Sequence, residues 1–325
     1  MIDGREGVAV SHEIGEQGTV RLRTVSGSVA VHAVDGSVAR VTVRRAGGHD
    51  HPLDPALVQV EKASDRLDVS VPGRSAGPSV LAAIVSREAR VAVDVWAEVP
   101  RHAAVEIAVV SAEMEVEGCH GEQRYETVSG DVSLRRIAGR IGIKTVSGDV
   151  EMRAGQALTL EADAVSGDLD VEASRLERVV ISAISGDVAL SGELARGVAH
   201  RVDTVSGDLQ LITPTGATIR VRGPAVSVRG VPGEQILGGR GSREVVIGDG
   251  RATLAFRSMS GDLEVLPAEP APGDHEPAER AAGDHGPSEH AAPARSPLQV
   301  LQALERGEID VDEATRRLEE LSAHV

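Results

Sequence analysis

Residues 145–150 read Thr-Val-Ser-Gly-Asp-Val, and the Ser-Gly-Asp tripeptide inside this stretch returns at nearly constant intervals along the chain. The serines of its six copies are 18, 19, 19, 21 and 54 residues apart: Ser129, Ser147, Ser166, Ser185, Ser206 and Ser260. Because 54 is three times 18, we expect two degenerate units between residues 209 and 257. A short fixed period is typical of folds built from stacked units.

Two degenerate relatives extend the repeat towards the N-terminus. Val110-Ser111-Ala112-Glu113 places its serine 18 residues before Ser129, and Thr24-Val25-Ser26-Gly27 is a further copy near the start. The repeat therefore covers most of residues 20–266.

Each unit contains two short runs in which apolar and polar residues alternate, one on either side of a turn. Ile141 and Ile143 precede one Ser-Gly-Asp, and Val150 and Met152 follow it. Alternation with period two and many β-branched residues predict half-buried strands. A unit this small cannot bury a core alone, so the units must stack. We predict an all-β fold, a β-solenoid resembling a single-stranded β-helix with about 18–20 residues per coil, although an antiparallel stack of hairpins would show the same pattern.

The Ser-Gly-Asp tripeptide has a structural explanation that requires no chemistry. Glycine adopts the positive φ of a tight turn, and Ser and Asp side chains bond nearby backbone N–H groups. We expect the tripeptide to form a corner of each coil, with its aspartates bonded to their own turn.

The composition excludes several classes of protein. A formal net charge of −16 argues against nucleic acid as a ligand, and 1% aromatic residues leave few platforms for stacking bases or sugars. Cys119 is the only cysteine, so there is no intramolecular disulfide. The charged N-terminal residues do not resemble a signal peptide, and no apolar run is long enough to span a bilayer. We expect a soluble, cytoplasmic protein with at most peripheral membrane contact through a partner.

The repeated Thr-Val-Ser-Gly-Asp-Val units, with the preceding strand at 95–100 (Val-Trp-Ala-Glu-Val-Pro), resemble the putative-adhesin β-strand repeat family of bacteria, a domain of unknown function. The resemblance covers about residues 20–266 and is clearest from 91 to 211. It implies a structural or binding module.

Beyond the repeats, the sequence changes character twice. Residues 267–295 are rich in Pro, Ala, His and acidic residues and predict a disordered linker. Residues 296–325 predict a helical hairpin that begins at the N-cap Ser296 and turns at Gly307. We therefore divide the chain into a repeat domain (1–266), a linker and a hairpin. The hairpin is similar to short helical modules attached to such repeat domains in bacterial envelope-stress proteins, which implies oligomerisation or partner binding through its apolar residues: Leu301, Leu304, Ile309, Leu318 and Leu321.

Three sets of side chains could in principle bind a metal. Stacked coils would align one aspartate per unit at about 4.8 Å, and such a column could bind cations such as Ca²⁺: Asp131, Asp149, Asp168, Asp187 and Asp208. The linker and tail histidines and the cluster His49-Asp50-His51 lack a recognised ligand spacing: His275, His285, His290 and His324. We expect turn and linker residues at all of these positions, and no cofactor.

No sequence pattern indicates catalysis. The carboxylates repeat identically instead of forming one distinct acid and base pair, and no nucleophile elbow or phosphate loop is present. We predict a non-enzymatic, acidic scaffold that binds a protein partner. The alternative is a polysaccharide-binding or polysaccharide-cleaving β-helix, which would need a non-repeating cluster of acids near residues 212–257.

Overall fold

A computed structural model describes residues 7–47, 53–71, 91–223, 225–229, 235–239 and 242–267. These residues are almost entirely β-strand, apart from one turn of 3-10 helix at Pro55–Leu57, where the Asp54 side chain accepts a hydrogen bond from Ala56 N. The strands belong to one hydrogen-bonded system. The prediction of an all-β repeat fold is confirmed.

The chain divides into two units, Met1–Pro270 and Ala271–Val325, and the second lies wholly outside the described residues. Pro267, which the sequence assigned to the linker, is the last residue of strand β21 (Ser260–Pro267). The rest of the linker, the hairpin and the domain boundaries stay predictions.

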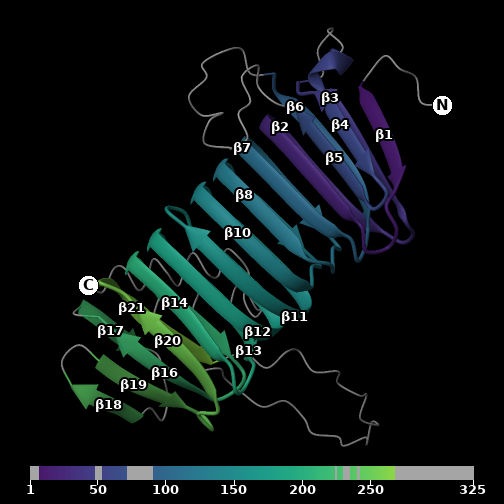
Figure 1. The fold of residues 1–325 in the computed structure, drawn as a ribbon. Helices are drawn as coiled ribbons and strands as arrows, with labels where there is room; N and C mark the ends of the chain where they lie inside the picture. Colours follow the sequence, from purple (N-terminus) through teal and green to yellow (C-terminus); the bar gives the residue numbers. More distant parts are fainter. Residues whose placement is uncertain are drawn as a thin grey trace, which may run out of the picture. The chain divides into compact units, whose positions relative to one another are not determined.

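The central repeats occupy residues 104–213, and their units are stacked in chain order, so that β7, β8 and β10 are neighbours on one face (Figure 1). One bend of each unit is the Ser-Gly-Asp corner. At the opposite bend, β11 and β12 continue with a shift in pairing register. The central strands are β7 (Ala104–Glu117), β8 (Gln123–Ser129), β9 (Val132–Arg135), β10 (Gly139–Ser147), β11 (Val150–Ala164), β12 (Leu169–Ser185), β13 (Val188–Leu194), β14 (Ala199–Ser206) and β15 (Leu209–Thr213).

Neighbouring central units pair in parallel, with equivalent residues aligned. Ser129 lies opposite Ser111 on one side and Ser147 on the other, and Ser185 lies opposite Ser206. The degenerate copy at Ser111 is therefore a true unit of the stack. Parallel pairing with this register also excludes an antiparallel stack of hairpins in this region.

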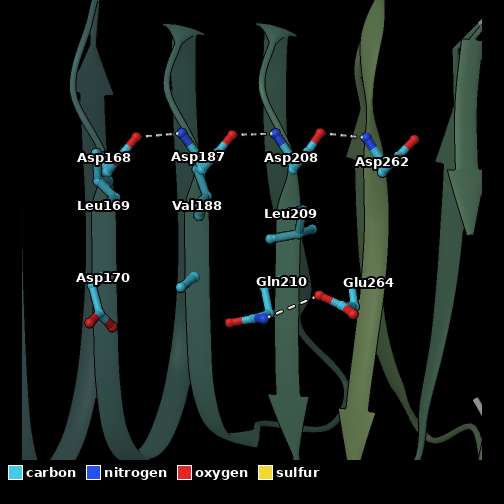
Figure 2. Close-up of a pocket in the computed structure, with 11 residues that line it drawn as sticks. Asp168, Leu169, Asp170, Asp187, Val188, Asp208, Leu209, Gln210, Asp262 and Glu264 are labelled. Carbon is cyan, nitrogen blue, oxygen red and sulfur yellow. Dashed lines mark hydrogen bonds between the residues drawn. The ribbon is translucent and has the colours of Figure 1, made fainter. Parts of the chain in front are cut away.

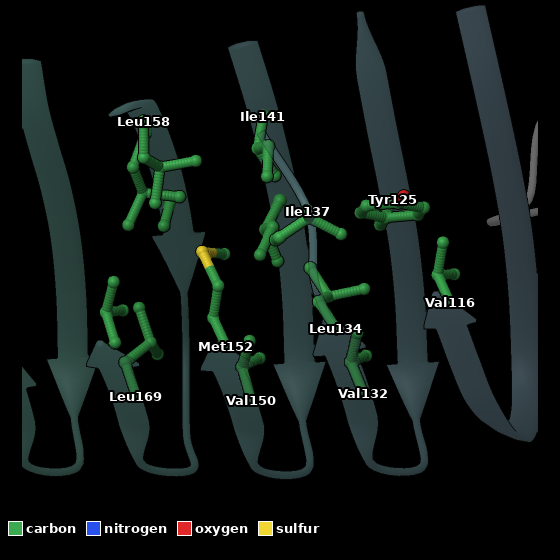
Figure 3. Packing of buried hydrophobic residues seen from close by; sticks show 14 of the residues in the cluster. Val116, Tyr125, Val132, Leu134, Ile137, Ile141, Val150, Met152, Leu158 and Leu169 are labelled. Carbon is green, nitrogen blue, oxygen red and sulfur yellow. The ribbon is translucent and has the colours of Figure 1, made fainter. Parts of the chain in front are cut away.

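The core fills the space between the strand before each corner and the strand after it. Ile141 and Leu158 face Val150 and Met152 across this space (Figure 3), and all four side chains are buried. Alternate residues along these strands are buried and exposed, as in β10 and β11. The apolar alternation in the sequence thus correctly predicts which residues form the core.

At the N-terminal end, the chain leaves the stack and later returns to it. Residues 19–32 of β2 pair in parallel with residues 104–117 of β7, so these two units are adjacent in the stack. In the sequence they are separated by residues 35–103. On its other side, β2 pairs in parallel with β5 and with β6. Beyond these strands the pairing is antiparallel: β4 pairs with β5, β3 with β6, and β1 with β3. The strands of this end are β1 (Val8–Glu13), β2 (Thr19–Val34), β3 (Val38–Arg45), β4 (Gln59–Ala63), β5 (Arg66–Val71) and β6 (Val93–Pro100).

The C-terminal end corrects an expectation from the sequence. The unit that contains the sixth Ser-Gly-Asp stacks directly on the unit at 199–213, with Ser260 opposite Ser206 and Leu263 opposite Leu209. The strands of this end are β16 (Ala217–Arg222), β17 (Ala225–Arg229), β18 (Gln235–Gly239), β19 (Ser242–Ile247), β20 (Ala252–Arg257) and β21.

Of the two degenerate units expected between 209 and 257, one is present at 217–229, but it stacks beyond the sixth Ser-Gly-Asp unit and not between that unit and the unit at 199–213. Strands β16 and β17 pair in parallel with the far sides of β20 and β21, while β18 and β19 form an antiparallel pair next to β16. The last unit brings Leu254, Phe256 and Leu263, all fully buried, into the position next to the regular core.

Candidate functional site

The Ser-Gly-Asp corners form the most regular feature of the molecule. Gly148 and Gly167 have φ values of 119° and 111°, a region that favours glycine. A Cβ atom on Gly167 would also lie 2.3 Å from the carbonyl oxygen of Gly148 in the neighbouring corner. Glycine is required both for the turn and for the close approach of stacked corners.

The aspartates of these corners bond to the neighbouring unit, not to their own turn as we expected. The Oδ1 atom of each aspartate accepts a hydrogen bond from the backbone N–H of the next aspartate in the stack. The five donor and acceptor pairs are Asp149 N to Asp131 Oδ1 at 3.0 Å, Asp168 N to Asp149 Oδ1 at 2.9 Å, Asp187 N to Asp168 Oδ1 at 2.8 Å, Asp208 N to Asp187 Oδ1 at 2.8 Å and Asp262 N to Asp208 Oδ1 at 2.7 Å. We call this row of six residues the aspartate ladder.

The aspartate ladder forms one wall of a groove of about 370 Å³ over the last four units (Figure 2). The other wall consists of outward-facing residues two positions after each ladder aspartate, and buried aliphatic residues lie between the walls. The lining residues are Asp168, Asp187, Asp208 and Asp262 of the ladder, Asp170, Ala189, Gln210 and Glu264 of the outward row, and Leu169, Val188 and Leu209. Six of them are carboxylates and none is Lys or Arg, so the groove is acidic.

Neighbouring groups hold some of the groove side chains in place. Gln210 Nε2 donates to Glu264 Oε2 at 3.2 Å, and this contact joins two units that are far apart in sequence. Arg153 Nη2 donates a hydrogen bond to Asp170 Oδ2 at 2.7 Å, and this bond is the main reason why the pKa of Arg153 is raised. The groove carboxylates of Asp168, Asp187 and Asp208 are oriented by the backbone, since the Oδ1 atom of each accepts a hydrogen bond from an amide of the next unit.

The candidate cation column is present as a geometric row of aspartates. In the part of the chain that the structure describes, no group of three or more His, Cys, Asp or Glu side chains is placed to hold a metal ion. In the aspartate ladder, the Oδ1 atom of Asp131, Asp149, Asp168, Asp187 and Asp208 instead accepts a backbone hydrogen bond.

The other predicted sites fall into two groups. Cys119 is fully buried, and burial raises the pKa of its thiol to about 12, so the thiol is unreactive at neutral pH. The His49-Asp50-His51 cluster lies outside the described residues, as do the linker and tail histidines and the hairpin leucines and isoleucine: His275, His285, His290, His324, Leu301, Leu304, Ile309, Leu318 and Leu321.

Sequence reasoning missed half of the groove. Asp262 was left out of the candidate cation column, although it completes the sixth Ser-Gly-Asp and donates its backbone N–H to Asp208 Oδ1. Asp170, Gln210 and Glu264 carry no common residue type, and only their shared position two residues after an aspartate could have indicated them.

The groove and its repeats lie within a region that matches a known domain. The Toastrack DUF4097 family matches residues 103–266, which is half of the chain. The protein belongs to the Toastrack DUF4097 family. This membership confirms the resemblance to a bacterial β-repeat domain of unknown function.

Solved structures similar to this Toastrack protein have about 10% sequence identity to it. A putative adhesin from Bacteroides fragilis is 10% identical, covers 81% of this chain and 98% of its own, and has a TM-score of 0.41. A putative lipid binding protein from Parabacteroides distasonis is 11% identical, with 81% and 97% coverage and a TM-score of 0.37. A putative cell adhesion protein from Clostridium sporogenes is 11% identical, with 81% and 100% coverage and a TM-score of 0.28.

No curated protein matches the sequence. Among the described residues of the Toastrack protein, none forms a helix long and apolar enough to cross a membrane.

Proposed function

We propose that the parallel repeats form a β-solenoid that serves as a non-catalytic binding scaffold, and that its acidic groove holds a positively charged segment of a partner protein. The observation that carries this proposal is the aspartate ladder. Its carboxylates are aligned by backbone amides, so a cationic partner meets a preset row of acceptors and little ordering entropy is lost on binding.

The arrangement of the carboxylates supports binding over catalysis. General acid and base chemistry needs two groups in different environments. The ladder aspartates instead occupy equivalent positions, and each of Asp131 to Asp208 makes the same hydrogen bond.

Nothing in the described residues favours the polysaccharide alternative. That alternative required a groove with a non-repeating cluster of acids near residues 212–257, and the groove of the described residues has none of its lining there. Glu244 pairs with Arg220 there, and Asp249 pairs with Arg196 and Arg251.

Three finer parts of the proposal rest on the sequence alone. They are a cytoplasmic location, a link to envelope-stress signalling, and oligomerisation or partner binding through the predicted C-terminal hairpin.

Binding of a fluorescent octalysine peptide tests the groove. Asp187→Asn combined with Asp208→Asn removes two charges but keeps the Oδ1 acceptors, so the fold should be unchanged. Two exposed ion pairs contribute roughly 0.4–2 kcal/mol, so we expect the Kd to rise about 3- to 10-fold. Added salt should reduce the difference.

The matched control is Glu161→Gln combined with Glu122→Gln, which removes the same charge from exposed positions outside the groove. An equal effect of both double variants would show that only net charge matters. Absence of octalysine binding to the unaltered protein would refute the proposal.

A further inference from the structure

A row of exposed aliphatic side chains runs along the same corners as the aspartate ladder. The residue immediately before each of the last five Ser-Gly-Asp tripeptides is large, apolar and about half exposed. These residues are Val146 (47%), Val165 (43%), Ile184 (52%), Val205 (47%) and Met259 (64%). We call them the aliphatic row.

Strand preference alone does not explain the aliphatic row. Thr is β-branched like Val and favours strands equally well, and it would leave no apolar surface exposed. Met259, the most exposed member, is not β-branched. At the other end of the stack, the equivalent Val25 and Val110 are only 7% exposed, whereas four of the five members of the exposed row belong to the units that line the groove.

The register of the strands makes the row straight. Ser166 N donates to the carbonyl of Val146 at 3.0 Å, and Ser185 N donates to that of Val165 at 3.0 Å. Ser206 lies opposite Ser260. With neighbouring strands about 4.8 Å apart, five members span about 19 Å.

The spacing of the row fits a helix better than an extended chain. Successive side chains on one ridge of an α-helix are about 5.4 Å apart. Over four intervals, the mismatch between these side chains and a row with a spacing of about 4.8 Å reaches only about 2.4 Å. Alternate side chains of an extended strand are about 6.7 Å apart, so over four intervals their mismatch with the row reaches about 7.6 Å, which is more than one interval of the row.

The surroundings of the row indicate the charge and size of its partner. The aspartate ladder lies three residues further along each unit, so an acidic partner or an anionic membrane is repelled and Lys or Arg is favoured. Five half-exposed aliphatic side chains offer on the order of a few hundred Å². A stable dimer needs roughly 800 Å² per partner, so the row alone is too small for a second copy of this chain.

We infer that the aliphatic row binds an amphipathic helix of a partner protein, with the apolar ridge of the helix on the row and its flanking Lys or Arg side chains towards the aspartate ladder. This inference rests on the proposed function, because the aspartates are shared with the acidic groove. The cationic partner segment is thereby specified further as a helix with an apolar ridge.

Anisotropy titrations of the full chain with three labelled 18-residue peptides test the inference. The first contains Leu and Lys, with Leu on one helical ridge. The second has the same composition with its Leu scattered around the helix, and the third replaces every Lys of the first with Glu. We expect the first peptide to bind at least about 10-fold more tightly than either of the others, a difference of about 1.4 kcal/mol.

The variant Val165→Thr/Ile184→Thr/Val205→Thr keeps β-branched residues at exposed positions and should abolish this preference without changing octalysine binding. Val180→Thr, a half-buried residue of the same strand as Ile184, is the control and should preserve the preference.

Each other outcome overturns the inference. Equal binding of the ridge and scattered peptides, or no effect of the triple variant, excludes the row as a helix site. Tight binding of the Glu peptide excludes a cationic partner. A change in mass by light scattering in the triple variant identifies a second copy as the occupant. If the unaltered protein still binds octalysine in these cases, the proposed function stands. If the unaltered protein does not bind octalysine, both the proposed function and the helix site are refuted.

Discussion

The central repeats and the two ends of the stack use the same pairing rule but differ in chain order. Between residues 104 and 213, each unit stacks on the unit that precedes it in sequence. At both ends, the neighbour in space is far away in sequence, because β2 pairs with β7 and β14 pairs with β20. The repeat therefore specifies register but not the order of units at the ends.

The ends also differ from the centre in strand direction. Antiparallel pairs follow the last parallel unit on both sides, with β3 against β6 at one end and β19 against β16 at the other. The parallel stacking of units therefore does not continue through these strands. The groove depends on the C-terminal arrangement, since the returning unit supplies Asp262 and Glu264.

Phe256→Ala should produce the largest effect and should separate the C-terminal end from the centre. Phe256 is fully buried in β20, and truncation of a buried Phe costs about 3–5 kcal/mol. Because stacked units open from their ends, hydrogen exchange should accelerate in β14–β21 and stay slow in β8–β12. Uniform acceleration across the stack would contradict the difference between end and centre.

Three glycine variants should show what the central corners require. Gly167→Ala combines positive φ with a contact at 2.3 Å and should cost about 3 kcal/mol. Gly197→Ala has φ +75° in open space and should cost about 1 kcal/mol. Gly155→Ala, with neither constraint, should be neutral or slightly stabilising. Urea denaturation measures all three, and equal costs for Gly167 and Gly197 would show that stacking of the corners is not tight.

Tyr125→Phe should have an intermediate effect where the N-terminal units meet the centre. The buried Tyr125 hydroxyl donates to Gln123 Oε1 at 2.9 Å, and Gln123 Nε2 donates to three backbone carbonyls: Cys119 at 3.1 Å, Gly121 at 3.2 Å and Ala138 at 2.9 Å. Loss of the hydroxyl leaves a buried acceptor unsatisfied and should lower the free energy of unfolding by about 1–2 kcal/mol. Gln123→Leu should cost more than Tyr125→Phe, and the reverse order would show that the carbonyls are satisfied without Gln123.

The pH dependence of stability should be the smallest effect. Burial lowers the pKa of His200 below its ordinary value, so between that lowered pKa and about 6.5 the unfolded state binds more protons than the folded state. The stabilisation is complete above pH 6.5 and is lost as the pH falls through this window. His200→Gln should flatten the unfolding free energy between pH 7 and 5, and an unchanged slope would exclude His200 as its cause.

The sequence predicted the local features well because they depend on neighbouring residues. Alternation identified buried residues such as Ile143 and Met152, and Ser-Gly-Asp identified the corners. It did not predict that Ser260 neighbours Ser206, since the position of a strand within the stack is decided by long-range burial. The 54-residue interval before the sixth tripeptide gave no indication that Asp262 lies next to Asp208 in the groove. The exposed side of the aliphatic row could not be distinguished from ordinary strand alternation.

The placement of the last Ser-Gly-Asp unit is the central claim, because the groove, the sixth ladder aspartate and the end of the aliphatic row all depend on it. Disulfide formation tests it directly in two double variants, Ser206→Cys/Ser260→Cys and Ser206→Cys/Ala225→Cys. Ser206 pairs with Ser260, which in turn pairs with Ala225, so the second pair is about 9.6 Å apart, beyond the roughly 7 Å limit for a disulfide. Mild oxidation followed by electrophoresis and mass spectrometry should show a bridge only in the Ser206/Ser260 variant, whereas a bridge only in the Ser206/Ala225 variant would show that the units stack in chain order.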